Sequence, residues 1–292
     1  MNIVGHQKIQ KILLRSIERG AVSHAYIFAG PQHLGKFGVA LGFAERLAGN
    51  SREVNPDIIV IGPDTDESKG IIRKKEIKIE KIRELQHQLR MTSHFGKYKI
   101  AIVDDADRMN KSAQNAMLKI LEEPAEKVAI ILIAANLNKI LPTIISRCVL
   151  KKFSPVSERE IRKILPANLE NGEEIIFWSL GRPGLAKALL ENPKELESRR
   201  EAEKELAGLP ASNISERFSL AEKMSKDSSA LMEKLGWWVV LLRENLIGRK
   251  KMFSCPLEKI FKFLEQTQKS VEIMRETNSN PRLVLENLFM DF

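Results

Sequence analysis

An eight-residue stretch, GPQHLGKF at residues 30–37, comes close to a phosphate-binding loop. Gly30, Gly35 and Lys36 stand where the pattern G-x-x-x-x-G-K-[ST] requires glycine, glycine and lysine. In such a loop, backbone N–H groups at a helix N-terminus and the lysine ammonium hold phosphate oxygens. The last position of the pattern needs a hydroxyl to coordinate Mg²⁺, but here it is Phe37. The stretch therefore predicts a nucleotide-type loop that lacks a metal ligand.

Acidic and amide side chains follow two apolar stretches further along the chain. KIAIVDDADRM ends its apolar run in Asp104 and Asp105, where P-loop proteins carry the carboxylate that holds Mg²⁺. Asn136 follows the apolar run VAIILIAA, a position from which a polar side chain can sense a γ-phosphate. Paired acidic residues are also common in turns, and a glycine-rich turn can form without any ligand. Found together and in this order, the residues favour a P-loop sheet over coincidence.

Positive charge is concentrated in the first half of the chain. The net charge is +9, and much of the excess lies in one segment, at Lys69, Arg73, Lys74, Lys75, Lys78, Lys81 and Arg83. Such a segment suits a polyanion, and Lys74, Lys75, Lys78 and Lys81 are the candidates for contact with a nucleic-acid backbone. No aromatic residue interleaves these cations to stack on bases. A solvated loop and helix face explains them equally well.

Composition limits the class of protein. With 292 residues, 43% hydrophobic and 29% charged, the chain reads as a soluble globular protein long enough for about two domains. No stretch approaches the roughly 20 apolar residues that span a bilayer, and no signal peptide is visible at the N-terminus. Cys148 and Cys255 lie far apart, so neither a disulfide nor a zinc site is expected. The sequence predicts a cytoplasmic protein.

The pattern of apolar residues divides the chain into two regions with different predicted secondary structure. Near-continuous apolar runs, typical of strands buried on both faces, alternate with helical spacing in the first half. The strands are expected at 25–30, 57–62, 99–105 and 128–135, and the helices between them at 35–48, 78–91 and 111–122. After about Phe153 only helix-like segments follow. We therefore predict an α/β parallel-sheet domain at 1–154, a small helical domain at 155–210 and a helical bundle at 211–292.

Three further motifs resemble those of a known family. They are the lead-in SHAYIFAGP at 23–31, the segment AQNAMLKILEEP at 113–124 and the triplet Ser146-Arg147-Cys148. Together with the loop they resemble the AAA+ clamp-loader subunits, and most of all the delta-prime family of bacterial DNA polymerase III. The resemblance is densest over residues 1–155, and the C-terminal helices agree only in class.

The resemblance implies an architecture, partners and a role. It implies a RecA-like AAA+ sheet domain, a helical lid and a C-terminal collar domain that assembles with ATP-hydrolysing subunits and a delta subunit. That complex places a sliding clamp on primed DNA. By the same resemblance Arg147 is an arginine finger, which reaches the ATP of a neighbouring subunit rather than one bound to its own chain.

Two defects in the nucleotide site predict that the chain hydrolyses no ATP. Phe37 removes a Mg²⁺ ligand, and Asp105 replaces the glutamate of the active subunits. The shorter carboxylate would end about 1.5 Å too far back to order an attacking water. Because Lys36 is retained, weak ATP binding without hydrolysis stays open. Many relatives also carry a four-cysteine zinc module, but the segment AGNSREVNP at 48–56 has no cysteine, so no zinc is expected.

Other classes of protein fit less well. An ATP-hydrolysing clamp-loader subunit or another AAA+ ATPase is the main alternative, and it requires Ser or Thr where Phe37 stands. A P-loop kinase of small molecules would need the same hydroxyl and an arginine-rich lid. An independent DNA-binding regulator would need a basic recognition helix, which the C-terminal half does not offer.

Overall fold

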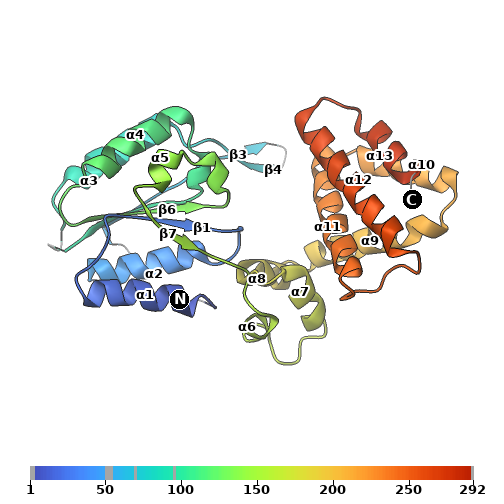
Figure 1. Cartoon of the computed structure of the whole chain (residues 1–292), viewed down its shortest axis with the longest axis horizontal. Helices are drawn as coiled ribbons and strands as arrows, with labels where there is room; N and C mark the ends of the chain where they lie inside the picture. Colours follow the sequence, from blue (N-terminus) through green and yellow to red (C-terminus); the bar gives the residue numbers. More distant parts are fainter. Residues whose placement is uncertain (1–3, 50–54, 69–70, 95–96, 291–292) are drawn as a thin grey trace. The chain divides into compact units, whose positions relative to one another are not determined.

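The computed structural model describes residues 4–49, 55–68, 71–94 and 97–290 of the chain (Figure 1). Lys69 and most of the cysteine-free segment at 48–56 lie outside these ranges, as does the side chain of Arg73. The chain forms two compact units, Met1–Glu191 and Asn192–Phe292. The strands described here all belong to the first unit, and the second unit is helical.

A five-stranded sheet forms the centre of the first unit, in the order β2-β5-β6-β1-β7. Every neighbouring pair in it is parallel. The strands are β1 (Ala25–Ala29), β2 (Ile58–Ile61), β5 (Lys99–Val103), β6 (Val128–Ala134) and β7 (Val149–Lys152). Each residue of β1, β5 and β6 is buried, which is why their sequences are continuous apolar runs rather than alternating ones. The predicted strands are confirmed to within two residues at their ends.

Helices cover both faces of the sheet (Figure 1). Phe43 of α2 packs with Phe28 in one core cluster, whereas Ile82 of α3 and Met117 of α4 pack with Ile27 in another. Successive residues of a strand point to opposite faces, so the neighbours Ile27 and Phe28 serve opposite layers. The helices are α1 (Gln7–Glu18) and α2 (Lys36–Ala48) on one face, and α3 (Ile79–Arg90) and α4 (Lys111–Glu122) on the other.

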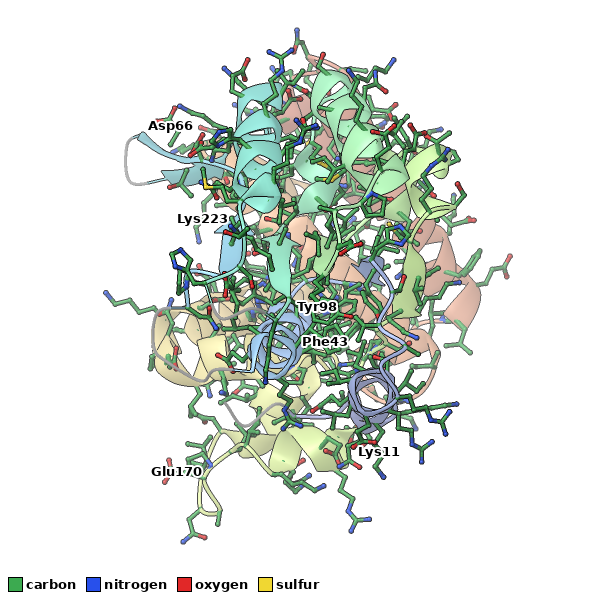
Figure 2. The ribbon with its side chains drawn as sticks, turned by 90° about the vertical axis from the view of Figure 1, so that its left-hand side faces the viewer. Lys11, Phe43, Asp66, Tyr98, Glu170 and Lys223 are labelled. Atoms are coloured by element: carbon green, nitrogen blue, oxygen red, sulfur yellow. The ribbon has the colours of Figure 1, made fainter. Side chains whose placement is uncertain are left out.

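Two β elements have no counterpart among the predicted strands. One is the edge strand β7, and the other is a hairpin of β3 (Thr65–Ser68) and β4 (Ile71–Lys74) that projects from the sheet (Figures 1 and 2). Both are short and rich in charged residues, so they lack the apolar runs of the central strands. The remaining short elements are η1 (Ala106–Arg108), η2 (Leu137–Lys139) and α5 (Pro142–Ile145).

Three helices complete the first unit, α6 (Glu158–Arg162), α7 (Gly172–Ser179) and α8 (Pro183–Glu191). Trp178 of α7 is fully buried, as expected for a core side chain. Gly181, just before α8, has a φ of +69° and accepts a 2.8 Å hydrogen bond from the N–H of Val156. A Cβ at this glycine would lie 2.5 Å from the Val156 carbonyl oxygen, so no larger residue fits.

The second unit consists of α9 (Pro193–Gly208), η3 (Leu209–Ala211), α10 (Ile214–Ser225), α11 (Ser228–Leu246), α12 (Leu257–Glu276) and α13 (Pro281–Met290). The buried Trp238 of α11 donates from Nε1 to the carbonyl of Ala202 in α9 at 2.8 Å. Helix α9 therefore packs in this unit, although it falls within the range predicted for the small helical domain. The division at 154 and 210 stays a prediction. No helix in the described ranges is long and apolar enough to cross a membrane.

Candidate functional site

The glycine-rich loop joins β1 to α2, the strand-to-helix context that a phosphate-binding loop requires. Gly35 has a φ of +83° and directly precedes α2. Gly30 has a φ of +148°, and a Cβ there would lie 2.2 Å from the carbonyl oxygen of Phe153. Gly30 is therefore required by the close approach of the chain that leaves β7, independently of any ligand.

Lys36 folds back into its own loop. Its ammonium donates hydrogen bonds to the carbonyl oxygens of Gly30 and, at 2.6 Å, of Pro31. The side chain is buried, and this burial lowers the pKa of Lys36 although nearby carboxylates oppose the shift. Two of the three ammonium donors are thus engaged inside the protein, so a phosphate would reach only the third unless it displaced these hydrogen bonds.

Two other carbonyls of the loop are also occupied. The His33 carbonyl accepts a 2.8 Å hydrogen bond from the N–H of Gly184, in the first turn of α8. The Leu34 carbonyl lies 3.1 Å from Nε2 of His6, which donates when the proton is on that nitrogen. Phe37 is partly buried and packs on the core cluster of the α1–α2 face. Hydrogen bonds from distant segments hold the loop, and Phe37 adds apolar packing instead of a metal ligand.

The acidic pair Asp104 and Asp105 directly follows β5, and a lysine forms an ion pair with Asp105. Asp105 is buried and its Oδ2 lies 2.6 Å from the ammonium of Lys74 at the end of the β3–β4 hairpin. Arg108 donates to the carbonyl of Lys74 at 2.9 Å and fastens the hairpin there. The pKa of Asp104 is raised, first by burial and then by the negative charge of Asp105. A protein cation thus neutralises the carboxylate where the sequence predicted a metal-type site.

Asp107 connects the acidic end of β5 to the end of β6, and the sequence had not singled it out. Its Oδ1 accepts from the N–H of Ala135 at 3.1 Å and its Oδ2 from the N–H of Asn136 at 3.2 Å. The exposed Asn136 uses its own side-chain oxygen to accept from the N–H of Asn138, which caps η2. The third acidic residue of DDADR was the only available signal for this role.

The structure brings the predicted nucleotide-type residues together. The carboxylates of Asp104, Asp107 and Asp105 all lie close enough to act electrostatically on Lys36. These groups follow β1 and β5, and Asn136 follows β6, so they meet at the edge formed by the carboxyl ends of the parallel strands. Among the described residues, no three His, Cys, Asp or Glu side chains are arranged to hold a metal ion.

Arg147 lies on the opposite side of the sheet, where the parallel strands begin. It precedes β7 by two residues and its Nη2 lies 2.9 Å from Oε1 of Glu122, the last residue of α4. Its Nη1 donates to the carbonyl of Thr143 at 3.0 Å. Because β7 runs parallel to β1, Arg147 lies near the amino end of β1 and the loop lies at its carboxyl end. The five residues of β1 span about 16 Å, beyond the reach of one side chain.

The residues beside Arg147 anchor it. Ser146 donates to the same Thr143 carbonyl at 3.0 Å. Cys148 is half-buried against the core, and this burial raises the pKa of its thiol to about 12. The thiol is therefore an apolar anchor at neutral pH, and Arg147 presents its remaining donors to solvent, with 37% of its side chain exposed.

The basic segment is largely neutralised within the protein. Besides the Lys74 pair, Lys75 lies 3.0 Å from Asp66, and Lys81 lies 2.5 Å from Asp64. The hydrogen bond from Lys81 lowers the pKa of Asp64. Lys78 is exposed at the start of α3. Three of the four candidate lysines thus have carboxylate partners, and their contact with nucleic acid stays a prediction.

Comparisons with known proteins agree on one family. A family model described as "DNA polymerase III, delta subunit" matches residues 5–157. The DNA polymerase III subunit delta' of Bacillus subtilis (strain 168) is 32% identical over 53% of this chain and 49% of that protein. The subunit delta' of Pseudomonas aeruginosa (strain PAO1) is 31% identical over 59% of this chain and 57% of that protein. The chain therefore aligns with about half the length of these relatives.

A solved structure is similar over nearly the whole chain. It is a DNA polymerase III gamma subunit-related protein from Thermotoga maritima, with a TM-score of 0.50 and 22% identity. The match covers 96% of this chain and 97% of the other. At this identity the likeness concerns the fold alone, and it confirms the expected parallel-sheet domain followed by helical regions.

Proposed function

Since the chain belongs to the DNA polymerase III delta subunit family and is delta-prime-like within it, we propose that it acts as a clamp-loader subunit. In this role it joins the ATPase subunits and a delta subunit, and the complex places a sliding clamp on primed DNA. The helices of residues 211–292 would form the collar contacts, with residues 155–210 as the lid. The match of the sheet domain to the family supports the assignment.

We further propose that this chain does not itself hydrolyse ATP. Phe37 supplies no Mg²⁺ ligand, and Lys36 is engaged by carbonyls of its own loop. Lys74 places a positive charge on Asp105, so a metal ion near that carboxylate would be repelled. A bound nucleotide would compete with these contacts, which weakens its affinity. The fold of an ATPase is retained for the shape that it gives to the complex.

The proposal also gives Arg147 a catalytic role in a neighbouring subunit. The observation that carries it is the position of Arg147, which is partly exposed and lies at the opposite end of the parallel strands from the loop. A guanidinium presented from this edge can neutralise the charge that develops on the γ-phosphate of ATP held by another chain. Its anchors at Thr143 and Glu122 leave other N–H donors available.

Reconstitution of the complex with Arg147→Ala tests this role. Arginine fingers contribute about 10³–10⁵ in rate where they act, and a ring with several ATP sites should show a smaller net loss. We expect DNA- and clamp-stimulated ATP hydrolysis and clamp loading to fall while gel filtration shows an intact complex. Arg147→Lys should rescue poorly because an ammonium lacks the planar fork.

The matched control is Arg159→Ala, which removes an exposed arginine from α6 of the same unit. It should leave hydrolysis unchanged. Normal hydrolysis by an intact complex that carries Arg147→Ala would exclude the finger. Loss of assembly in that variant would instead make Arg147 an interface residue.

A further inference from the structure

Helix α1 carries a row of positive charge on its outer face. Lys8, Lys11 and Arg15 of α1 and Arg19, which directly follows the helix, are all exposed, at intervals of three, four and four residues. At 3.6 residues per turn these intervals place the four side chains on one side of the helix. We call this row the α1 basic stripe. Figure 2 views α1 nearly end-on and labels Lys11 at its outer side.

The α1 basic stripe is not neutralised by its surroundings. Within the described ranges, no carboxylate lies within ion-pair distance of any of its four cations. The basic segment of the sequence behaves in the opposite way, because Lys74, Lys75 and Lys81 each pair with an aspartate. Among the described residues, more cations therefore lack a carboxylate partner along α1 than along the segment that the sequence had indicated.

The opposite side of α1 is already used for packing. Leu13 is only 2% exposed, and Ile9 and Ile17 pack on the same core cluster. The stripe itself has one exposed apolar neighbour, Ile12. The helix therefore has no apolar face left to insert into a lipid surface, and it holds its cations on a rigid support.

We propose that the α1 basic stripe contacts the sugar–phosphate backbone of nucleic acid. Its four cations extend over about 16 Å of helix, comparable to about five phosphates of one strand at ~3.4 Å each. The absence of aromatic residues from the stripe fits contact with phosphates rather than with bases. The geometry of the stripe is observed independently of any proposed role. The choice of nucleic acid among polyanions rests on the proposed function in DNA replication.

The test measures binding of the isolated 292-residue chain to a fluorescent primer–template DNA by anisotropy, from low to physiological salt. The stripe variant carries Lys8→Gln, Lys11→Gln and Arg15→Gln, because glutamine preserves helix propensity and most of the side-chain length. The control variant carries Lys75→Gln, Lys78→Gln and Lys81→Gln and loses the same number of charges. It leaves Lys74 on its buried partner.

Each phosphate contact with duplex DNA contributes about 0.9 to the slope of log K against log salt. The stripe variant should therefore reduce that slope by up to about 2.7 and weaken binding at low salt, and the control should change it by less than half as much. Equal slopes for the two variants would overturn the proposal. So would a stripe variant that binds DNA normally but loses binding to vesicles of phosphatidylglycerol and phosphatidylcholine.

Circular dichroism and Tm establish that both variants are folded. If the triple stripe variant is not, the single changes Lys11→Gln and Arg15→Gln should each reduce the slope by about 0.9, and unchanged slopes would again overturn the proposal. The isolated chain contains no neighbouring ATP site. Failure of this test would therefore leave the Arg147 finger intact, and failure of the finger would leave the stripe intact.

Discussion

The two sides of the central sheet at which the parallel strands end (the carboxyl edge) and begin (the amino edge) are built in opposite ways. At the carboxyl edge, Lys36 is buried in its own loop, and Lys74 covers the buried Asp105. At the amino edge, Arg147 is held by one exposed carboxylate and one carbonyl, and part of its guanidinium faces solvent. The carboxyl edge has Lys36 and Asp105 paired within the protein, and the amino edge leaves guanidinium donors available to another molecule.

Under the proposed function, this difference accounts for a nucleotide-binding fold that has lost one role and kept another. Cations from the protein occupy the carboxyl edge, which therefore stabilises the fold without needing a ligand. The amino edge lies about 16 Å away across β1, so changes in the loop need not disturb it. A subunit that only completes a neighbour's ATP site needs the amino edge for its arginine. It needs the carboxyl edge only for the shape of the fold.

Removal of one ion pair at each edge should give the largest difference in stability. Lys74→Met leaves the buried carboxylate of Asp105 unpaired, and we expect a loss of about 1–3 kcal/mol in the free energy of unfolding. Glu122→Gln removes the exposed partner of Arg147 and should cost about 1 kcal/mol or less. Urea unfolding monitored by circular dichroism measures both. Equal losses would remove the contrast between the edges.

The raised pKa of Asp104 predicts a pH-dependent gain in stability for Asp104→Asn. Asparagine keeps an oxygen to accept the 3.0 Å hydrogen bond from the N–H of Asp105 and removes a charge that burial and Asp105 disfavour. Below the ordinary pKa of 3.8 the Asp104 carboxyl is protonated in both the folded and the unfolded state, so the substitution removes no charge. As the pH rises above that value, the folded wild type carries an increasing penalty that the variant lacks.

Melting curves at several pH values test this expectation. At pH 7 the variant should melt higher by about 1–3 °C, and the difference should shrink as the pH falls toward 4. A variant that melts lower than the wild type at pH 7 would show that a metal ion or a further hydrogen bond stabilises the charged carboxylate. The carboxyl edge would then not be saturated by its own lysines.

The smallest expected effect is that of ATP on the isolated chain. A ligand that binds only the folded state raises its stability according to its concentration relative to Kd. Because Lys36 is engaged within its loop, MgATP at about 1 mM should leave Tm within ~1 °C of its ligand-free value. Phosphate release should not exceed that of a Lys36→Ala control. Turnover that Lys36→Ala abolishes would place the chain among the ATP-hydrolysing subunits.

The central strands and the helices between them could be predicted because their signals are local. Buried parallel strands such as β6 require continuous apolar runs, and α4 matches its predicted range of 111–122 residue for residue. The edge strand β7 and the β3–β4 hairpin could not be found in this way. Their partners, not their own side chains, stabilise them, and such pairing leaves little trace in a single stretch of sequence.

The candidate site divides in the same manner. The sequence by itself determined that Asp104 and Asn136 stand at the ends of strands, because they directly follow apolar runs, and it showed the change to Phe37 through the spacing of the glycine-rich loop. Only the tertiary structure decided where each charge is neutralised. Lys74 meets Asp105 across 31 positions of sequence, whereas the α1 basic stripe meets no carboxylate in the described parts of the chain. Ion pairing depends on distances of a few ångströms between elements, and residue spacing along the chain does not fix those distances.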